Sequence, residues 1–238
     1  MVLNKVGIMK SRPYLIWLFA AAIFGAYALV MVNWWPYLSN DVVGRYAVMA
    51  EEFAAGNWQE AFHVRFPPLF NCLTGLVVMV TGVSGLTACR LVAVGALSLS
   101  LVAFYHFVRK IFDEETAWWA VAILAILPMY VTVSGRGTRE TVQLLAYSLL
   151  TLGLVTHSAW LGLGFFILTT TRVDSIVVGG ILLGFYWLYA ICRREYAHLI
   201  FPTFGYLMGL LVTSWMVYYL SGYFVPIYRL AKLLGGAE

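Results

Sequence analysis

Long apolar runs without charge, separated by short polar stretches, are the feature that most constrains this chain. The first run, residues 14–32, contains no charged side chain and is long enough to cross the roughly 30 Å hydrocarbon core of a bilayer as a helix. Only 11% of the chain is charged and 62% is hydrophobic, whereas soluble domains carry about 25% charged residues. Alternation typical of strands is not sustained anywhere. The sequence therefore predicts an all-α, polytopic transmembrane helical bundle.

Basic residues indicate the orientation of this bundle. Lys5, Lys10 and Arg12 precede the first run, and the pairs Arg109–Lys110 and Arg193–Arg194 follow later runs. Short cytoplasmic loops are enriched in Lys and Arg, so these sites and the N-terminus are expected in the cytoplasm. We expect residues 14–32 to be a retained helix, because the run is long for a signal peptide and more spans follow. The scattered basic residues fit this topology better than nucleic-acid binding, despite a net charge of +4.

About seven spans are expected, in one module over residues 1–238. The first span covers 14–32, an outer loop 33–90, the remaining spans 91–220, and an outer tail 221–238. Residues 69–83, which follow Pro67–Pro68, are short for a crossing. If they crossed, Arg109–Lys110 would lie outside, against the positive-inside preference. A re-entrant or interfacial helix is therefore predicted there.

The outer loop holds an unusual density of ionisable residues near its start. Asn40 is expected to cap a helix from Asp41, and Gly56–Asn57 to end it. An apolar stripe on this helix predicts an amphipathic juxtamembrane helix on the membrane surface; its members are Val42, Tyr46, Met49 and Phe53. We interpret Glu51, Glu52 and Glu60 as solvated surface. Asp41 differs, because it lies just beyond the first span and is held near the bilayer.

The predicted topology also places eight basic residues outside, where the positive-inside preference does not expect them. They are Arg45, Arg65, Arg90, Arg136, Arg139, Arg172, Arg229 and Lys232. Either the topology is wrong, or these residues form an anion-binding site, since guanidinium groups bind phosphate bidentately. For each arginine alone, snorkelling to the interface is an equal alternative.

The three cysteines show no CxxC pair and no metal spacing, and no metal cluster is evident, although Asp41 with Glu51 or Glu52 leaves a divalent cation open.

Taken in order, several segments resemble the GT-C superfamily of membrane glycosyltransferases, in particular its protein-mannosyltransferase and aminoarabinose-transferase-like branch. The resemblance spans residues 14–232 and is carried by Asp41, Tyr46, Ala50, Gly56–Asn57–Trp58, Phe66–Pro67–Pro68–Leu69, Arg90, the turn LTTTRVDS, and Gly222, Pro226, Ala231 and Lys232. It implies an inverting enzyme that moves a sugar from a polyprenyl-phosphate donor to an extracytoplasmic acceptor, in a bacterial inner membrane.

The resemblance also implies residue roles. Asp41 matches the family's catalytic carboxylate and is expected to be the general base. Cations must stabilise the leaving lipid phosphate, and the candidates are Arg65, Arg136, Arg139 and Lys232, with Arg45 and His63 nearby. No cofactor is expected, and the partners are the lipid-linked donor and membrane lipids.

Family members usually continue through further spans, often into a soluble outer domain, so this chain resembles an N-terminal seven-span module. Three alternatives follow: a minimal enzyme, a truncated product, or one half of a complex in which a partner subunit supplies the missing spans or a soluble domain. The alternative function is a non-catalytic subunit that binds a lipid or holds a partner protein. A small transporter is disfavoured, because the charges cluster at span ends.

Overall fold

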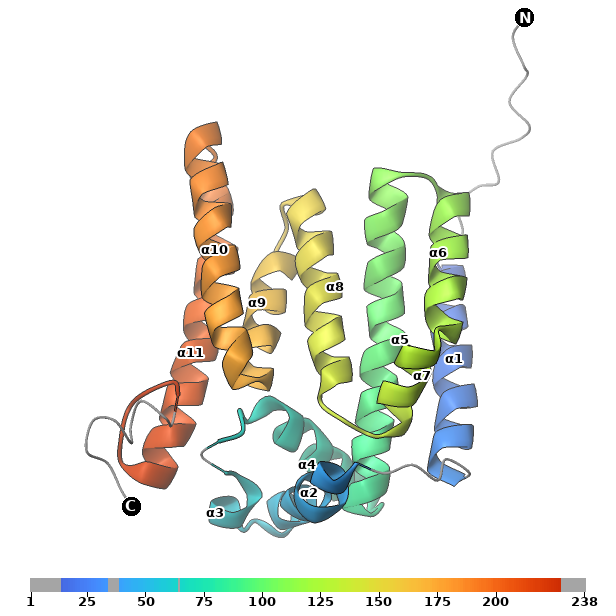
Figure 1. Ribbon diagram of the computed structural model, residues 1–238, viewed down its shortest axis with the longest axis vertical. Helices are drawn as coiled ribbons and strands as arrows, with labels where there is room; N and C mark the ends of the chain where they lie inside the picture. Colours follow the sequence, from blue (N-terminus) through green and yellow to red (C-terminus); the bar gives the residue numbers. More distant parts are fainter. Residues whose placement is uncertain (1–13, 34–38, 64, 228–238) are drawn as a thin grey trace, which may run out of the picture.

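The computed structural model describes residues 14–33, 39–63 and 65–227, and its regular structure within these ranges is entirely helical (Figure 1). The all-α prediction is confirmed. The elements are α1 (Tyr14–Asn33), a π-helical turn (Val42–Tyr46) that leads into α2 (Ala47–Ala55), α3 (Trp58–Ala61), α4 (Leu69–Thr81), α5 (Gly85–Ile111), α6 (Glu114–Ile126), α7 (Pro128–Gly135), α8 (Glu140–Thr156), α9 (Trp160–Thr171), α10 (Val173–Arg193), a 3₁₀ turn (Tyr196–Leu199) and α11 (Ile200–Ser221).

Four helical segments among the described residues are long and apolar enough to cross a membrane: α1, α5, α10 and Tyr196–Ser221. The pair α6 and α7 makes a fifth if it counts as one span, bent by 52°. Pro128 explains the bend, because it lacks an N–H and forces the preceding Leu127 to an extended ψ of 123°. The protein is therefore an integral membrane protein. At 17 and 12 residues, α8 and α9 are shorter than the roughly 20 residues of a crossing, so seven spans stay a prediction.

Glycines bring α9 into backbone contact with α8 and α11. A Cβ atom added to Gly153 would lie 2.2 Å from the backbone nitrogen of Leu161, and one added to Gly205 would lie 1.9 Å from the carbonyl oxygen of Gly162. Membrane helices pack closely where small residues let their backbones approach. The contact fixes α8, α9 and α11 as one packed unit, and it holds their connecting segments in a defined arrangement.

The first outer loop packs across one end of the bundle, at the bottom of Figure 1. Its helix begins at Asn40 itself, where the Ser39 carbonyl accepts hydrogen bonds from the N–H groups of Val42 and Val43 at 2.9 and 3.1 Å. The expectation that Asn40 caps this helix is therefore wrong. The predicted end is confirmed, since Gly56 takes a left-handed conformation with a φ of +81°.

The apolar stripe of this helix is buried by protein. Val42, Tyr46, Met49 and Phe53 are each at most 9% exposed. The first three share a core cluster with Phe70 of α4 and other side chains of the bundle. The stripe is thus not available to lipid, and the location of α2, α3 and α4 on the membrane surface stays a prediction.

Candidate active site

The two sets of basic residues lie at opposite ends of the bundle. The first outer loop, the α7–α8 connection and the α9–α10 connection meet at the lower end in Figure 1. They carry Arg45, Arg65, Arg136, Arg139 and Arg172, and Arg90 lies near the start of α5 at that end. The pairs Arg109–Lys110 and Arg193–Arg194 end helices at the upper end. This separation is what the topology predicts, although which end faces the cytoplasm stays a prediction; Arg229 and Lys232 lie outside the described residues.

Asp41 lies one residue before the π-helical turn, at the entrance of the outer loop. Its Oδ1 is 3.4 Å from Nη1 of Arg45, four residues later, and the two side chains are 61% and 57% exposed. An exposed pair of this kind contributes at most about 1 kcal/mol, so it orients the carboxylate without removing it from solvent. π-Helical turns occur often at functional sites. The carboxylate is positioned by its neighbour and open to a reactant.

The ring of Phe66 joins two of the predicted cationic residues. The Arg45 guanidinium lies 5.6 Å from the ring centre and the Arg139 guanidinium 5.4 Å from it. Arg139 also lies 5.8 Å from the ring of Tyr46, which itself packs edge-on against Phe66 at 5.6 Å. Cation–π contacts favour these positions for the guanidinium groups. Residues from the outer loop and from the start of α8 are thereby brought together.

Tyr46 has a strongly perturbed hydroxyl within this group. Burial raises its pKa to about 12, and the carboxylates of Glu140 and Asp41 add to the rise while Arg139 opposes it. The phenol therefore stays protonated at physiological pH and can act as a hydrogen-bond donor.

A small hollow of about 220 Å³ opens beside Arg45, and His63, Arg65 and Phe66 contribute to its lining. The N–H of Arg65 donates to Nδ1 of His63 at 3.1 Å. Burial, and then the charges of Arg65 and Arg45, lower the pKa of His63 below its usual value of 6.5. The lowered pKa favours the neutral imidazole at pH 7, and the two arginines that act on it line the same hollow. The hollow is smaller than the roughly 300–1,000 Å³ of a drug-sized site, and its charge suits a small anionic group.

Arg172 is neutralised by two carboxylates that the sequence did not single out. Its Nη1 lies 3.1 Å from Glu140 Oε1, and its Nε donates to Asp174 Oδ1 at 2.9 Å. Nearby, Gln143 donates to the hydroxyl of Ser175 at 2.9 Å. These contacts tie α8 to the α9–α10 connection. The motif TTTRVDS is the only sequence signal that points to them. Because both carboxylates pair with Arg172, this residue stabilises the packing of α8 against α10 instead of offering a free cation.

The remaining predicted arginines differ in whether their charge is available to a ligand. Among the described residues, Arg65, Arg136 and Arg139 have no carboxylate within ion-pair distance, so their charges are open to an anion. Arg90 is only 6% exposed, and its Nη1 donates to the Val32 carbonyl at 3.3 Å. It therefore fastens the end of α1 to α5.

Glu51 and Glu52, which a cation at Asp41 would recruit, are engaged elsewhere. Glu51 accepts the N–H of Gly85 at 2.8 Å and Glu52 accepts the amide of Asn57 at 2.6 Å. Glu51 thus anchors α2 to the start of α5, which the interpretation of Glu51 as solvated surface did not include. Within the described ranges, the metal-compatible groups of three side chains do not include Asp41.

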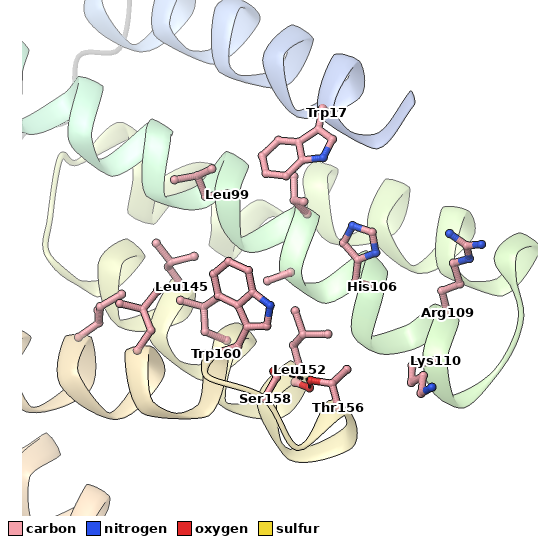
Figure 2. Close-up of a pocket in the computed structure, with 15 residues that line it drawn as sticks. Trp17, Leu99, His106, Arg109, Lys110, Leu145, Leu152, Thr156, Ser158 and Trp160 are labelled. Atoms are coloured by element: carbon pink, nitrogen blue, oxygen red, sulfur yellow. Dashed lines mark hydrogen bonds between the residues drawn. The ribbon is translucent and has the colours of Figure 1, made fainter. Parts of the chain in front are cut away.

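A larger cavity of about 740 Å³ lies away from this site, among α1, α5, α8 and α9. Figure 2 shows Trp17 and Trp160 in its wall and His106, Arg109 and Lys110 toward one side. Most of its remaining lining is aliphatic, from residues such as Leu99, Leu145 and Leu152. No sequence pattern predicted this cavity, because its wall comes from four separate helices.

The fold and its charged end define a polytopic α-helical membrane protein with an anion-suited site at one end of the bundle. A comparison with family models is more specific: residues 65–219 match the model of the dolichyl-phosphate-mannose-protein mannosyltransferase family. The chain belongs to this family, which indicates a membrane glycosyltransferase of the GT-C type. The resemblance seen in the sequence is confirmed. No individual curated protein matches the chain significantly. The matched range contains Arg65, Arg136 and Arg139, whereas Asp41, Arg45, His63 and Lys232 lie outside it.

Proposed function

We propose that this protein transfers a sugar from a polyprenyl-phosphate-linked donor to an acceptor at the end of the bundle that holds Asp41. One observation carries the proposal: the exposed Asp41 carboxylate lies 3.4 Å from Arg45, and the guanidinium groups of Arg45 and Arg139 lie 5.6 and 5.4 Å from the centre of the same Phe66 ring. A transfer that releases a phosphate needs both a base and cations in one place. Membership of the mannosyltransferase family supports a lipid-linked donor.

The proposed reaction is a single in-line displacement. The acceptor hydroxyl or amine attacks the anomeric carbon while the bond from that carbon to the phosphate oxygen breaks, which inverts the anomeric centre. The acceptor proton passes to the Asp41 carboxylate. The electron pair of the broken bond stays on the polyprenyl phosphate, which leaves with an added negative charge. The step consumes no cofactor and needs no metal.

The cations have distinct proposed roles in this step. Arg139, Arg65 and Arg136 stabilise the leaving phosphate, since none of them is paired with a carboxylate among the described residues. Lys232 is proposed for the same task from the family resemblance. Arg45 orients Asp41 at 3.4 Å. The neutral His63 supplies a hydrogen bond within the small hollow.

We place the site on the extracytoplasmic face of a bacterial inner membrane. The support is the position of Arg109–Lys110 and Arg193–Arg194 at the other end, because such basic pairs favour the cytoplasm. Glycosyl transfer there calls for a lipid-linked donor, since nucleotide sugars are not expected outside the cytoplasm.

A second candidate function is lipid binding without catalysis, by a subunit that holds a lipid or a partner protein. The apolar cavity of about 740 Å³ with Arg109 and Lys110 on one side favours it (Figure 2). An acyl chain fits such a lining, and the basic residues suit an anionic head group.

The substitution Asp41→Asn separates the two candidates. Membrane vesicles from cells that make the wild-type chain or the variant would be supplied with radiolabelled polyprenyl-phosphate mannose, and label transferred to endogenous acceptors would be measured. We expect a loss of about 10²–10⁴-fold, the usual contribution of a general base. Glu60→Gln is the matched control, because Glu60 is an exposed carboxylate of the same loop. Transfer at the wild-type rate by Asp41→Asn would refute the catalytic assignment and favour the lipid-binding subunit.

A further inference from the structure

Three metal-ligating side chains meet at the end of the bundle opposite Asp41. His157 follows α8, and Glu195 and His198 lie between α10 and α11. One ligand atom from each residue lies within 4.8 Å of the other two. The two imidazole rings are 4.9 Å apart, with an angle of 37° between their planes. We propose that these residues form a zinc-binding site that fastens the α8–α9 connection to the α10–α11 connection.

The backbone around the three residues is well fixed. Arg194 ends α10 in a left-handed conformation, after which the N–H of Glu195 donates to the Ala190 carbonyl at 2.9 Å and that of His198 to the Glu195 carbonyl at 3.1 Å. The glycine contacts of α9 with α8 and α11 hold the two connections beside each other. His157 itself has a φ of +48°, at a position where helices usually place glycine. A histidine is strained in this left-handed conformation, which glycine adopts without cost.

The ligand set fits zinc in type and in spacing. Zinc binds histidine nitrogen and carboxylate oxygen tetrahedrally at about 2.0–2.2 Å, which sets the ligand atoms about 3.4 Å apart. Rotation of the side chains closes the gap from 4.8 Å, because His157 is exposed and the other two are half-buried. Two imidazole nitrogens and one carboxylate oxygen leave the fourth position to water. Magnesium and calcium prefer oxygen ligands and fit this set poorly.

The site is independent of the proposed transfer reaction. It lies at the end that carries Arg193–Arg194, away from Asp41 and Phe66, and its role is to stabilise the packing of the last three helices. Cys192 is an exposed thiol three residues before Glu195 and lies outside the group of three. Substitution of Cys192 therefore tests whether zinc binds to this nearby thiol instead of to the three proposed ligands.

The test uses the full chain, purified in detergent with an affinity tag free of histidine. After removal of metal with EDTA and dialysis against zinc chloride, zinc per chain is measured by mass spectrometry. We expect about one zinc ion in the wild type, as in a single three-ligand site, and its loss in His157→Ala and His198→Ala. Cys192→Ser and His106→Ala should retain it. Zinc content unchanged in both histidine variants, or lost in Cys192→Ser, would overturn the proposal.

Two further measurements keep the proposal testable if the variants fold poorly. Added zinc should raise the melting temperature of the wild type and of Cys192→Ser, because it binds the folded state. Cobalt substituted into the wild type should give the visible spectrum of a tetrahedral site without thiolate charge transfer. A wild-type protein that shows neither the zinc shift nor the cobalt spectrum does not contain the site.

Discussion

The guanidinium of Arg139 lies 5.4 Å from the centre of the Phe66 ring, and this contact joins the start of α8 to the first outer loop. It places an arginine without a carboxylate partner, among the described residues, in the same group as Tyr46 and Asp41. The proposed leaving phosphate would meet this cation there.

Replacement of Arg139 should therefore affect the chemical step. We expect Arg139→Ala to lower transfer in the vesicle assay by about 10²–10³-fold, the range seen when one transition-state contact is lost. Arg139→Lys should recover only part of the rate, because lysine lacks the planar fork that binds phosphate. Arg193→Ala, at the other end of the bundle, is the control. Equal rates for Arg139→Ala and the wild type would remove Arg139 from the site.

Arg172 should act on stability through its two carboxylates. Its side chain is 29% exposed and that of Glu140 is 41% exposed, so solvent screens the pair in part. A double-mutant cycle of Arg172→Met and Glu140→Gln should give a coupling energy of about 0.5–1 kcal/mol. Denaturant unfolding in detergent measures it. If the two substitutions are simply additive, the contact contributes nothing to stability.

Close packing of α9 against α11 makes Gly205 sensitive to a single methyl group. In Gly205→Ala the new Cβ would meet the Gly162 carbonyl oxygen at 1.9 Å, and backbone atoms have little room to move. We expect a loss of about 1–3 kcal/mol in the free energy of unfolding.

The control for this substitution is Gly184→Ala in α10, where nothing lies within 4 Å of the added Cβ. It should be neutral, or more stable by up to about 1 kcal/mol, because alanine favours a helix. Thermal unfolding of the two variants in the same detergent compares them. Equal melting temperatures would contradict the close contact between α9 and α11.

His63 gives a prediction about pH. Its pKa in the folded protein lies below 6.5 because of burial and the charges of Arg65 and Arg45, so the unfolded chain binds the proton more readily. Stability is then fully present above about pH 6.5 and falls as pH drops through the folded pKa. NMR titration of the His63 ring should show the lowered midpoint, and Arg65→Gln should raise it. A midpoint at 6.5 that is insensitive to Arg65 would show that the charges do not act on His63.

Much of the architecture could be predicted from the sequence, because it depends on local patterns. In an apolar medium, the backbone N–H and C=O groups of the charge-free run from Tyr14 to Val32 find hydrogen-bond partners only if the run is helical. The stripe through Val42, Tyr46 and Met49 predicted an amphipathic helix and Gly56 predicted its end, although the structure buries the stripe against protein and not against the membrane surface. The order of basic residues along the chain likewise predicted that two sets would lie at opposite ends.

Only the tertiary structure decided which residues meet and which stay available. Arg172 and Arg139 look alike in the sequence, yet Glu140 and Asp174 neutralise the first, whereas the second lies on aromatic rings. His157 and His198 are far apart in the chain and come together through the packing of α9 against its neighbours. Composition and periodicity fix the face that each helix buries. The partners of a charged side chain depend on how helices distant in sequence cross, and that follows from contacts such as Gly205 with Gly162, which no local pattern reveals.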